Sequence, residues 1–255
     1  GLSVANASIA SFSDDVSDEK ALVVERFDRQ RVVATADTPE WILRLPQEDF
    51  CQATRTPPDR RYEVDGGPGI STGLALLGGG ERYQDDALTF ARAQLAFWLL
   101  AAPDGHAKNF SIFLKRSGHI MTPLYDVLSA WPIIGRGPNK WAQQDVKLAM
   151  ALRGSHTHRR LDEIATRHWR SLAAQTGTRN AFQHMVSMVD AAGSALDTLE
   201  SSLDANFPEH VWSSISKGVR SQRARFNKGL EHGDIGDAML AQRRTRGTGR
   251  NRTDE

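Results

Sequence analysis

The chain has 255 residues, a formal net charge of +1 and 40% hydrophobic residues, enough for one or two hydrophobic cores. The nearly neutral charge argues against a protein defined by bulk affinity for nucleic acid. The single cysteine, Cys51, excludes an internal disulfide and suits a reducing compartment. No signal peptide precedes the first predicted strand, so we expect a protein of the cytoplasm that does not enter a membrane.

The beginning of the chain is rich in predicted strands. The runs ASIASF (7–12) and ALVVERF (21–27) are typical of the two strands of a hairpin. The acidic, serine-rich stretch 13–20 between them predicts a solvated loop. A third strand is expected in WILRL (41–45). These patterns together predict a small β-rich part.

Most of the remaining chain is predicted to be helical. Pro46 should open a helix with residues 47–49 in its first turn. A longer helix is expected from Asp86 to Ala102, where it is stopped by Pro103. Because it is apolar nearly all round, it should lie inside a domain, and it is too short and too interrupted to span a bilayer. Further apolar stripes at helical spacing lie at 182–189, 196–203 and 208–219.

The most informative stretch is DGHAKN (104–109), which is followed by a predicted hairpin and then by Asp126. Asp104, Asn109 and Asp126 have the order and spacing of the phosphoryl-transfer residues of protein kinases. A hairpin made of 110–114 and 119–122 would turn the chain back, so that Asn109 and Asp126 converge. Taken singly, Asp104 could be a turn residue, Asn109 a cap and Asp126 the start of a helix. The three together indicate a kinase-type site.

Around this stretch the chain resembles the HipA family, the serine/threonine kinase toxins of bacterial HipBA toxin–antitoxin modules. The similar segments are AAPDGHAKNFSIFL, MTPLYDVLSAWP, ALVVERFDR, RLPQEDFCQ, YEVDGGPGI and DVKLAM. The resemblance covers about residues 1 to 235 and implies an α+β, protein-kinase-like fold. It divides the chain into the remainder of a β-rich lobe with the hinge (1–45), a helical large lobe (46–235) and a flexible basic tail (236–255).

The resemblance also implies roles for single residues, with ATP and Mg²⁺ as cofactors. Asp104 would be the catalytic base, and Asn109 and Asp126 the magnesium ligands. The nucleotide-binding residues would be Glu25, Arg26, Phe27, His106, Ala107, Lys108, Asn109, Tyr125 and Asp126. The residues alone favour a simpler interpretation of 25–27, namely an ordinary strand end.

Two features of the family are not visible in this chain, namely a serine-containing phosphate loop and the strand lysine that pairs with nucleotide phosphates. The glycine-rich stretch 65–69 fits no phosphate-binding motif and is expected to be a turn. We therefore expect weaker ATP binding and slower transfer than in a full-length relative. We also expect exposed edges on the small sheet that are prone to pairing or aggregation.

The function implied is that of a protein serine/threonine kinase toxin. Its partners would be a HipB-like helix-turn-helix antitoxin, DNA indirectly through that antitoxin, and a translation-related substrate such as an aminoacyl-tRNA synthetase. An alternative is a catalytically weak, kinase-like binding protein that acts with the antitoxin in repression. A third reading, a metal-dependent phosphoesterase built on Asp104, His106 and Asp126, lacks the further ligands of a two-metal site. The arginines of the tail could contact nucleic acid weakly.

Overall fold

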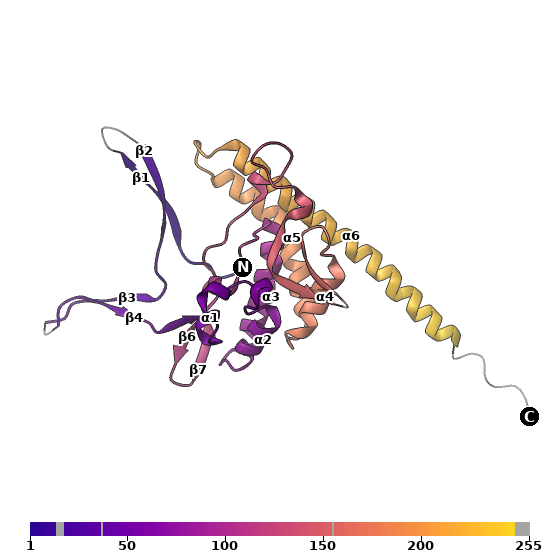
Figure 1. Cartoon of the computed structure of the whole chain (residues 1–255), viewed down its shortest axis with the longest axis horizontal. Helices are drawn as coiled ribbons and strands as arrows, with labels where there is room; N and C mark the ends of the chain where they lie inside the picture. The colour runs from indigo at the N-terminus through magenta and orange to yellow at the C-terminus, as the bar shows by residue number, and fades with distance from the viewer. Residues whose placement is uncertain (14–17, 37, 155, 248–255) are drawn as a thin grey trace, which may run out of the picture.

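The computed structural model describes residues 1–13, 18–36, 38–154 and 156–247, and only the backbone of Ser13, Asp18 and 232–247. Figure 1 shows a largely helical body with two β-hairpins projecting on one side and the end of the last helix on the other. The fold is therefore mixed α and β, as the sequence predicts. The helices are α1 (Phe50–Ala53), α2 (Ile70–Gly78), α3 (Tyr83–Leu100), α4 (Thr166–Gln175), α5 (Ala181–Ser202) and α6 (Glu209–Gly247).

The strands pair antiparallel in four small sheets within the described residues. They are β1 (Ala7–Ser13), β2 (Asp18–Val24), β3 (Arg29–Val32), β4 (Trp41–Arg44), β5 (Gln47–Asp49), β6 (Ser111–Lys115), β7 (Gly118–Met121), β8 (Lys147–Arg153) and β9 (Thr157–Arg160). The first hairpin joins β1 to β2 and the second joins β3 to β4. The predicted strands at 7–12, 21–27 and 41–45 are thus present, although they form two separate ribbons.

The predicted loop at 13–20 is too long, because Ser13 and Asp18–Lys20 continue the paired strands. Residues 14–17 of that loop lie outside the described residues. Strand β3 was not predicted from its sequence, RQRV. Its apolar content is a single valine, so pattern alone gave no signal, and the strand exists through its pairing with β4.

The prediction of a helix opening at Pro46 is wrong for residues 47–49. These residues form the edge strand β5, which pairs with β6 in the register Gln47 to Phe113 and Asp49 to Ser111. The helix begins only at Phe50, where Asp49 is the N-cap and accepts a hydrogen bond from the backbone N–H of Gln52 at 2.8 Å. A capping aspartate and a first-turn aspartate have similar sequence signatures, and the pairing with β6 decides between them.

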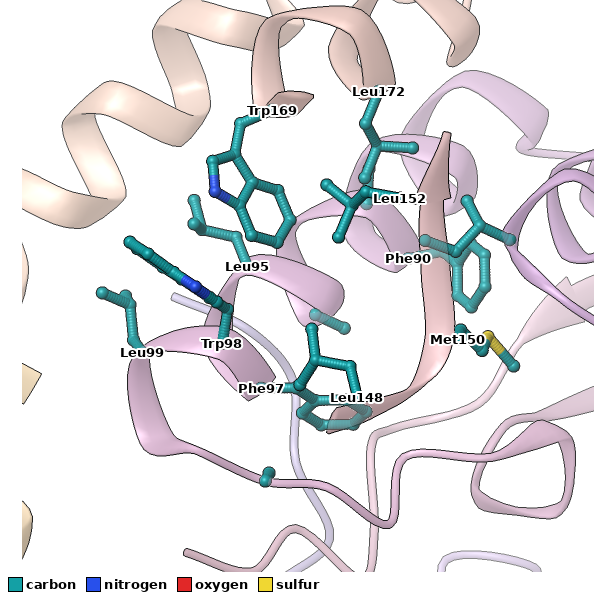
Figure 2. Packing of buried hydrophobic residues seen from close by; sticks show 14 of the residues in the cluster. Phe90, Leu95, Phe97, Trp98, Leu99, Leu148, Met150, Leu152, Trp169 and Leu172 are labelled. Carbon is teal, nitrogen blue, oxygen red and sulfur yellow. The ribbon is translucent and has the colours of Figure 1, made fainter. Parts of the chain in front are cut away.

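The long buried helix was predicted correctly and forms the centre of the body. It is α3, which begins one turn earlier than expected. Its side chains Phe90, Leu95, Phe97 and Trp98 are at most 2% exposed. Figure 2 shows them packed against side chains of β8 and α4. Each large apolar side chain buried in this way contributes about 1.5–3 kcal/mol relative to an exposed one, so α3 is held rigidly.

The hairpin β8–β9 was not anticipated in the part of the chain expected to be helical. Leu148, Ala149, Met150, Ala151 and Leu152 of β8 are all buried. A continuous apolar run of this length does not show period-2 alternation, so it cannot be distinguished from a helix by pattern. The predicted helices at 182–189, 196–203 and 208–219 are confirmed by α5 and α6.

The predicted tail at 236–255 begins within the last helix. The backbone of α6 continues as a helix to Gly247, and 248–255 lie outside the described residues. The segment AMLAQRR (238–244) consists of residues with high helix propensity, which explains the continuation. Within the described residues, no helix combines the length and the hydropathy needed to cross a membrane.

Candidate active site

The loop at 104–109 leaves the carboxyl end of α3 through a fixed connection. Ala101 ends the helix in a left-handed conformation with φ +49°. Gly105 lies directly against the ring of Phe97, where an added Cβ would be 2.2 Å from ring atoms. Only glycine fits there without a shift of the buried ring. The loop is therefore positioned by the core of the body.

Asp104 lies at the start of this loop, and its side chain is 46% exposed. Its Oδ1 accepts a hydrogen bond of 2.5 Å from the hydroxyl of Tyr62. The Nε2 atom of His106 is 3.9 Å from the same oxygen. The hydrogen bond to Asp104 raises the pKa of the Tyr62 phenol, which therefore remains protonated and donates.

His106 and Ala107 lie in the middle of the loop. The His106 side chain is largely buried, and burial lowers the pKa of its imidazole, so the ring is neutral at physiological pH. Its Nδ1 is buried and makes no hydrogen bond to the protein. Ala107 is fully buried, and its backbone N–H donates to the carbonyl of Arg61 at 3.3 Å. His106 therefore keeps one ring nitrogen without a partner in the protein.

The predicted magnesium ligands lie side by side. The β6–β7 hairpin returns the chain so that Nδ2 of Asn109 is 2.7 Å from Oδ2 of Asp126. Asn109 is buried, and its Oδ1 accepts the backbone N–H of His106 at 3.2 Å. Asp126 is exposed and adopts a left-handed conformation with φ +57°, which costs energy for a residue other than glycine. Strain of this kind is common at functional sites.

Lys108 is held by a residue that the sequence did not assign to the site. Its Nζ is 2.6 Å from Oδ2 of Asp49, the N-cap of α1. The same carboxylate also fixes the first turn of α1 through Gln52. The lysine cation is therefore anchored beside the loop, with its side chain 36% exposed.

A cavity of about 300 Å³ separates the hinge segment from this end of the loop. It is lined by Val24, Glu25, Arg26, Phe27, Asp28, Gln47, Asp49, Gln52, Ser111 and Tyr125. The Phe27 ring lies 5.7 Å from the ring of Tyr125, and burial raises the pKa of Tyr125 to about 12. The predicted hinge residues 25–27 and Tyr125 thus meet in one cavity, although Phe27 and Tyr125 are 98 positions apart in the sequence.

Asp28, which also lines this cavity, was not assigned from the sequence. It is buried and pairs with Arg26 at 2.6 Å and with Arg29. Hydrogen bonding from Arg26 lowers the pKa of Asp28 to about 2, so the carboxylate stays ionised. The pair fixes the backbone between β2 and β3, which is the predicted hinge segment.

A second cavity of about 440 Å³ lies at the Asp104 end of the loop. It is lined by Tyr62, Pro103, Asp104, Leu128, Ser129, Ala130, Ile133 and Trp141. Its walls are mostly apolar, and Asp104 supplies its one carboxylate. The loop therefore has a cavity at each end.

The donor atoms present suit a magnesium ion better than a transition metal. Among the described residues, no group of three or more histidine, cysteine, aspartate or glutamate side chains could hold a metal. Magnesium needs few protein ligands, because water and phosphate oxygens complete its shell. Asp126 with the amide oxygen of Asn109 would provide such a partial set, provided that the amide turns its oxygen toward Asp126.

Comparison with known families gives one match over most of the chain. Residues 1–196 match the profile of the HipA-like C-terminal domain. The chain belongs to this family. The resemblance expected from the sequence is thereby confirmed, and the family match contains Asp104, Asn109 and Asp126.

Individual relatives agree with the family. "Putative kinase Y4mE" of Sinorhizobium fredii is 30% identical over 203 residues, covering 76% of this chain and 44% of that protein. The serine/threonine-protein kinase toxin HipA of Shewanella oneidensis is 32% identical over 143 residues, covering 51% of this chain and 30% of the toxin. The chain therefore spans less than half the length of both relatives.

The fold matches a solved structure of the same family. The complex of Shewanella oneidensis HipA, HipB and operator DNA contains a chain that aligns with a TM-score of 0.75 at 20% identity. The match covers 91% of this chain and 53% of that chain. The fold is therefore the kinase-like fold of the HipA family, as predicted.

Proposed function

We propose that this HipA-family chain is part of a protein serine/threonine kinase that uses ATP and Mg²⁺. The observation that carries the proposal is the contact between Asn109 and Asp126 across the loop and hairpin, with Asp104 at the start of the same loop and a cavity at each end. The cavity lined by the hinge segment has the place and the aromatic lining for a nucleotide base. The cavity beside Asp104 would take the segment of the substrate protein that contains the reacting hydroxyl.

Each residue of the loop then has a chemical role. Asp104 accepts the proton of a serine or threonine hydroxyl as that oxygen attacks the terminal phosphate. Asn109 and Asp126 hold the metal, which when bound neutralises charge on the phosphates. Lys108, oriented by Asp49, places a further positive charge near them. His106, neutral because it is buried, can donate one hydrogen bond without changing the charge of the site.

The biological setting follows from the relatives by analogy. The solved structure with the matching fold is a complex of HipA with HipB and operator DNA, so a HipB-like helix-turn-helix antitoxin is the proposed partner, with DNA contacted through it. The proposed substrate is a translation-related protein of the bacterial cytoplasm, such as an aminoacyl-tRNA synthetase. A phosphoesterase reading is disfavoured, because the described residues lack a cluster that could hold two metals.

The experiment is transfer of phosphate from radiolabelled ATP to protein, with the chain itself and a bacterial lysate as acceptors. We expect labelled protein with Mg²⁺ and none with a chelator. Binding of ATP and of the antitoxin without any transfer would instead favour a catalytically weak protein that acts in repression.

A further inference from the structure

Tyr62 contacts the proposed catalytic base from a distant part of the chain and has no role in the chemistry described above. It precedes Asp104 by 42 residues, yet its hydroxyl donates to Oδ1 of Asp104 at 2.5 Å. It also lines the cavity that contains Asp104. A residue in this place either only packs beside the loop or acts through the carboxylate.

The backbone around Tyr62 is held tightly, which argues for a defined position. Its carbonyl accepts the N–H of Gly67 at 2.9 Å, closing a turn. A Cβ at Gly67 would lie 2.0 Å from the carbonyl oxygen of Arg60, so the turn needs glycine there. The next residue, Glu63, anchors the turn to β8, because its carboxylate accepts the N–H of Ala151 at 2.6 Å.

The ring of Tyr62 is held as firmly as its backbone. It meets the ring of His106 edge-on, with 4.9 Å between centroids. The guanidinium of Arg61 lies over the same ring, 5.0 Å from its centroid. These contacts of the ring and the backbone fix the Tyr62 hydroxyl beside Asp104. The hydroxyl therefore does not need to be ordered when a substrate binds.

The hydrogen bond from Tyr62 makes the two carboxylate oxygens of Asp104 different from each other. Oδ1 of Asp104 is occupied by Tyr62, and the structure gives Oδ2 no partner among the described residues. An aspartate side chain that is 46% exposed would otherwise rotate freely, because its terminal torsion has a broad energy minimum. With Oδ1 fixed, Oδ2 has a defined direction.

We propose that Tyr62 is a positioning residue, which holds Oδ1 of Asp104 so that Oδ2 faces the hydroxyl of the substrate. This inference rests on the proposed kinase function. In the reaction, the substrate oxygen forms a bond to the terminal phosphorus, the bond from that phosphorus to ADP breaks, and the hydroxyl proton passes to Oδ2. Tyr62 keeps its own proton throughout.

The test is the variant Tyr62→Phe, which keeps the ring and removes the hydroxyl. We expect kcat to fall about tenfold, while the KM values for ATP and for the protein acceptor stay within twofold. Tyr83→Phe is the matched control, because it removes a hydroxyl from an exposed tyrosine. The hydroxyl of Tyr83 accepts a hydrogen bond from the side chain of the neighbouring Gln84. We expect this control to have the activity of the unmodified protein.

A double variant separates positioning from general stability. If Tyr62 acts through Asp104, then Tyr62→Phe should change the residual rate by less than twofold when Asp104 is already Asn. Equal effects of Tyr62→Phe in both backgrounds would overturn the inference. The phenol itself gives a second readout: its absorbance titration, taken as the difference from Tyr62→Phe, should move to lower pH in Asp104→Asn.

The outcomes distinguish this inference from the proposed function. An active protein that is silenced by Asp104→Asn but unaffected by Tyr62→Phe would overturn the role of Tyr62 and leave the kinase function standing. A protein that transfers no phosphate under any condition would overturn both.

Discussion

Asp126 adopts a left-handed backbone conformation and places its carboxylate against the Asn109 amide, two unusual features at one residue. The position leaves the second carboxylate oxygen for a ligand. Nothing in the surrounding packing requires an aspartate here, because Asp126 is exposed. The proposed metal-binding role would give this exposed carboxylate a function.

Replacing either proposed metal ligand should therefore weaken magnesium-dependent ATP binding. For Asn109→Ala and Asp126→Ala we expect the Kd for ATP with Mg²⁺ to rise about tenfold or more, since each residue supplies one of few protein oxygens. Isothermal titration calorimetry with and without Mg²⁺ measures this. Asn206→Ala, an exposed asparagine outside the loop and hairpin, is the control. Unchanged magnesium dependence in both variants would remove the metal assignment.

His168 gives a prediction about stability at acid pH. It is buried, its Nδ1 accepts the N–H of Ala165, and its ring stacks on His158 at 4.0 Å. Burial, with the nearby charges of His158 and Arg167, lowers the pKa of His168 from 6.5 to about 4. Between these values the unfolded chain binds a proton that the folded chain does not, so the stability contribution is complete above pH 6.5 and lost on acidification.

We expect the free energy of unfolding to fall by roughly 3 kcal/mol between about pH 6.5 and pH 4 on account of this group. Urea unfolding measured across this range should show the loss. His168→Asn, whose amide oxygen can still accept the Ala165 N–H, should show a shallower dependence. Identical pH profiles of the two proteins would contradict the role of His168.

At the scale of elements, α3 decides where the loop lies. The helix is buried over most of its length, and the ring of its residue Phe97 lies directly against Gly105. The segment around Trp131 is tied to the same helix end, since the Trp131 indole donates to the carbonyl of Leu99 at 2.9 Å. Packing around α3 is thus transmitted directly to Asp104.

Gly105→Ala tests this coupling, because its new methyl group would meet the Phe97 ring at 2.2 Å. We expect a loss of about 1–3 kcal/mol in unfolding free energy from overpacking, together with reduced transfer. Gly78→Ala is the matched control, since a Cβ at Gly78 meets nothing within 4 Å and alanine favours a helix. Thermal unfolding of both variants measures the difference. If Gly105→Ala and Gly78→Ala were equally stable, the loop would be free to move away from the Phe97 ring, and the proposed coupling would be contradicted.

Several elements could be predicted from the sequence because their signals are local. The buried α3 and the β6–β7 hairpin follow from apolar runs bounded by proline and glycine. Strand β5 and the hairpin β8–β9 could not be predicted, because their existence depends on pairing or burial by distant segments. Local pattern cannot distinguish a short strand from the first turn of a helix.

For the candidate site of the whole molecule too, features marked by a local motif could be predicted from the sequence, and features that depend on long-range contacts could not. The order of Asp104, Asn109 and Asp126 along the chain was sufficient to predict their convergence, which the structure shows for Asn109 and Asp126. Tyr62, Asp49 and Asp28 could not be assigned, because no local motif marks their side chains as part of a site. Their contacts with the loop or the hinge become evident only in the folded chain.

The two hairpins that project from the body have a different character from the rest of the molecule. Figure 1 shows them separate from the helices, and Ile9, Phe12, Leu22 and Ile42 on them are each at least 60% exposed. Each hairpin is a two-stranded sheet, so each of its strands has one edge unpaired within that sheet, in keeping with the exposed strand edges expected for this part of the chain. The predicted hinge segment between the hairpins still meets the body through Phe27, which contacts Phe113 and Tyr125.

The central claim is that Asp104 is the base of a phosphoryl-transfer site, and the rate of transfer in Asp104→Asn tests it most directly. Asparagine keeps the size of the side chain and removes its ability to take a proton. We expect initial rates with radiolabelled ATP to fall about 100-fold or more with unchanged thermal unfolding, while Asp59→Asn, at an exposed position, keeps the original rate. A rate for Asp104→Asn within threefold of the unmodified protein would contradict the account.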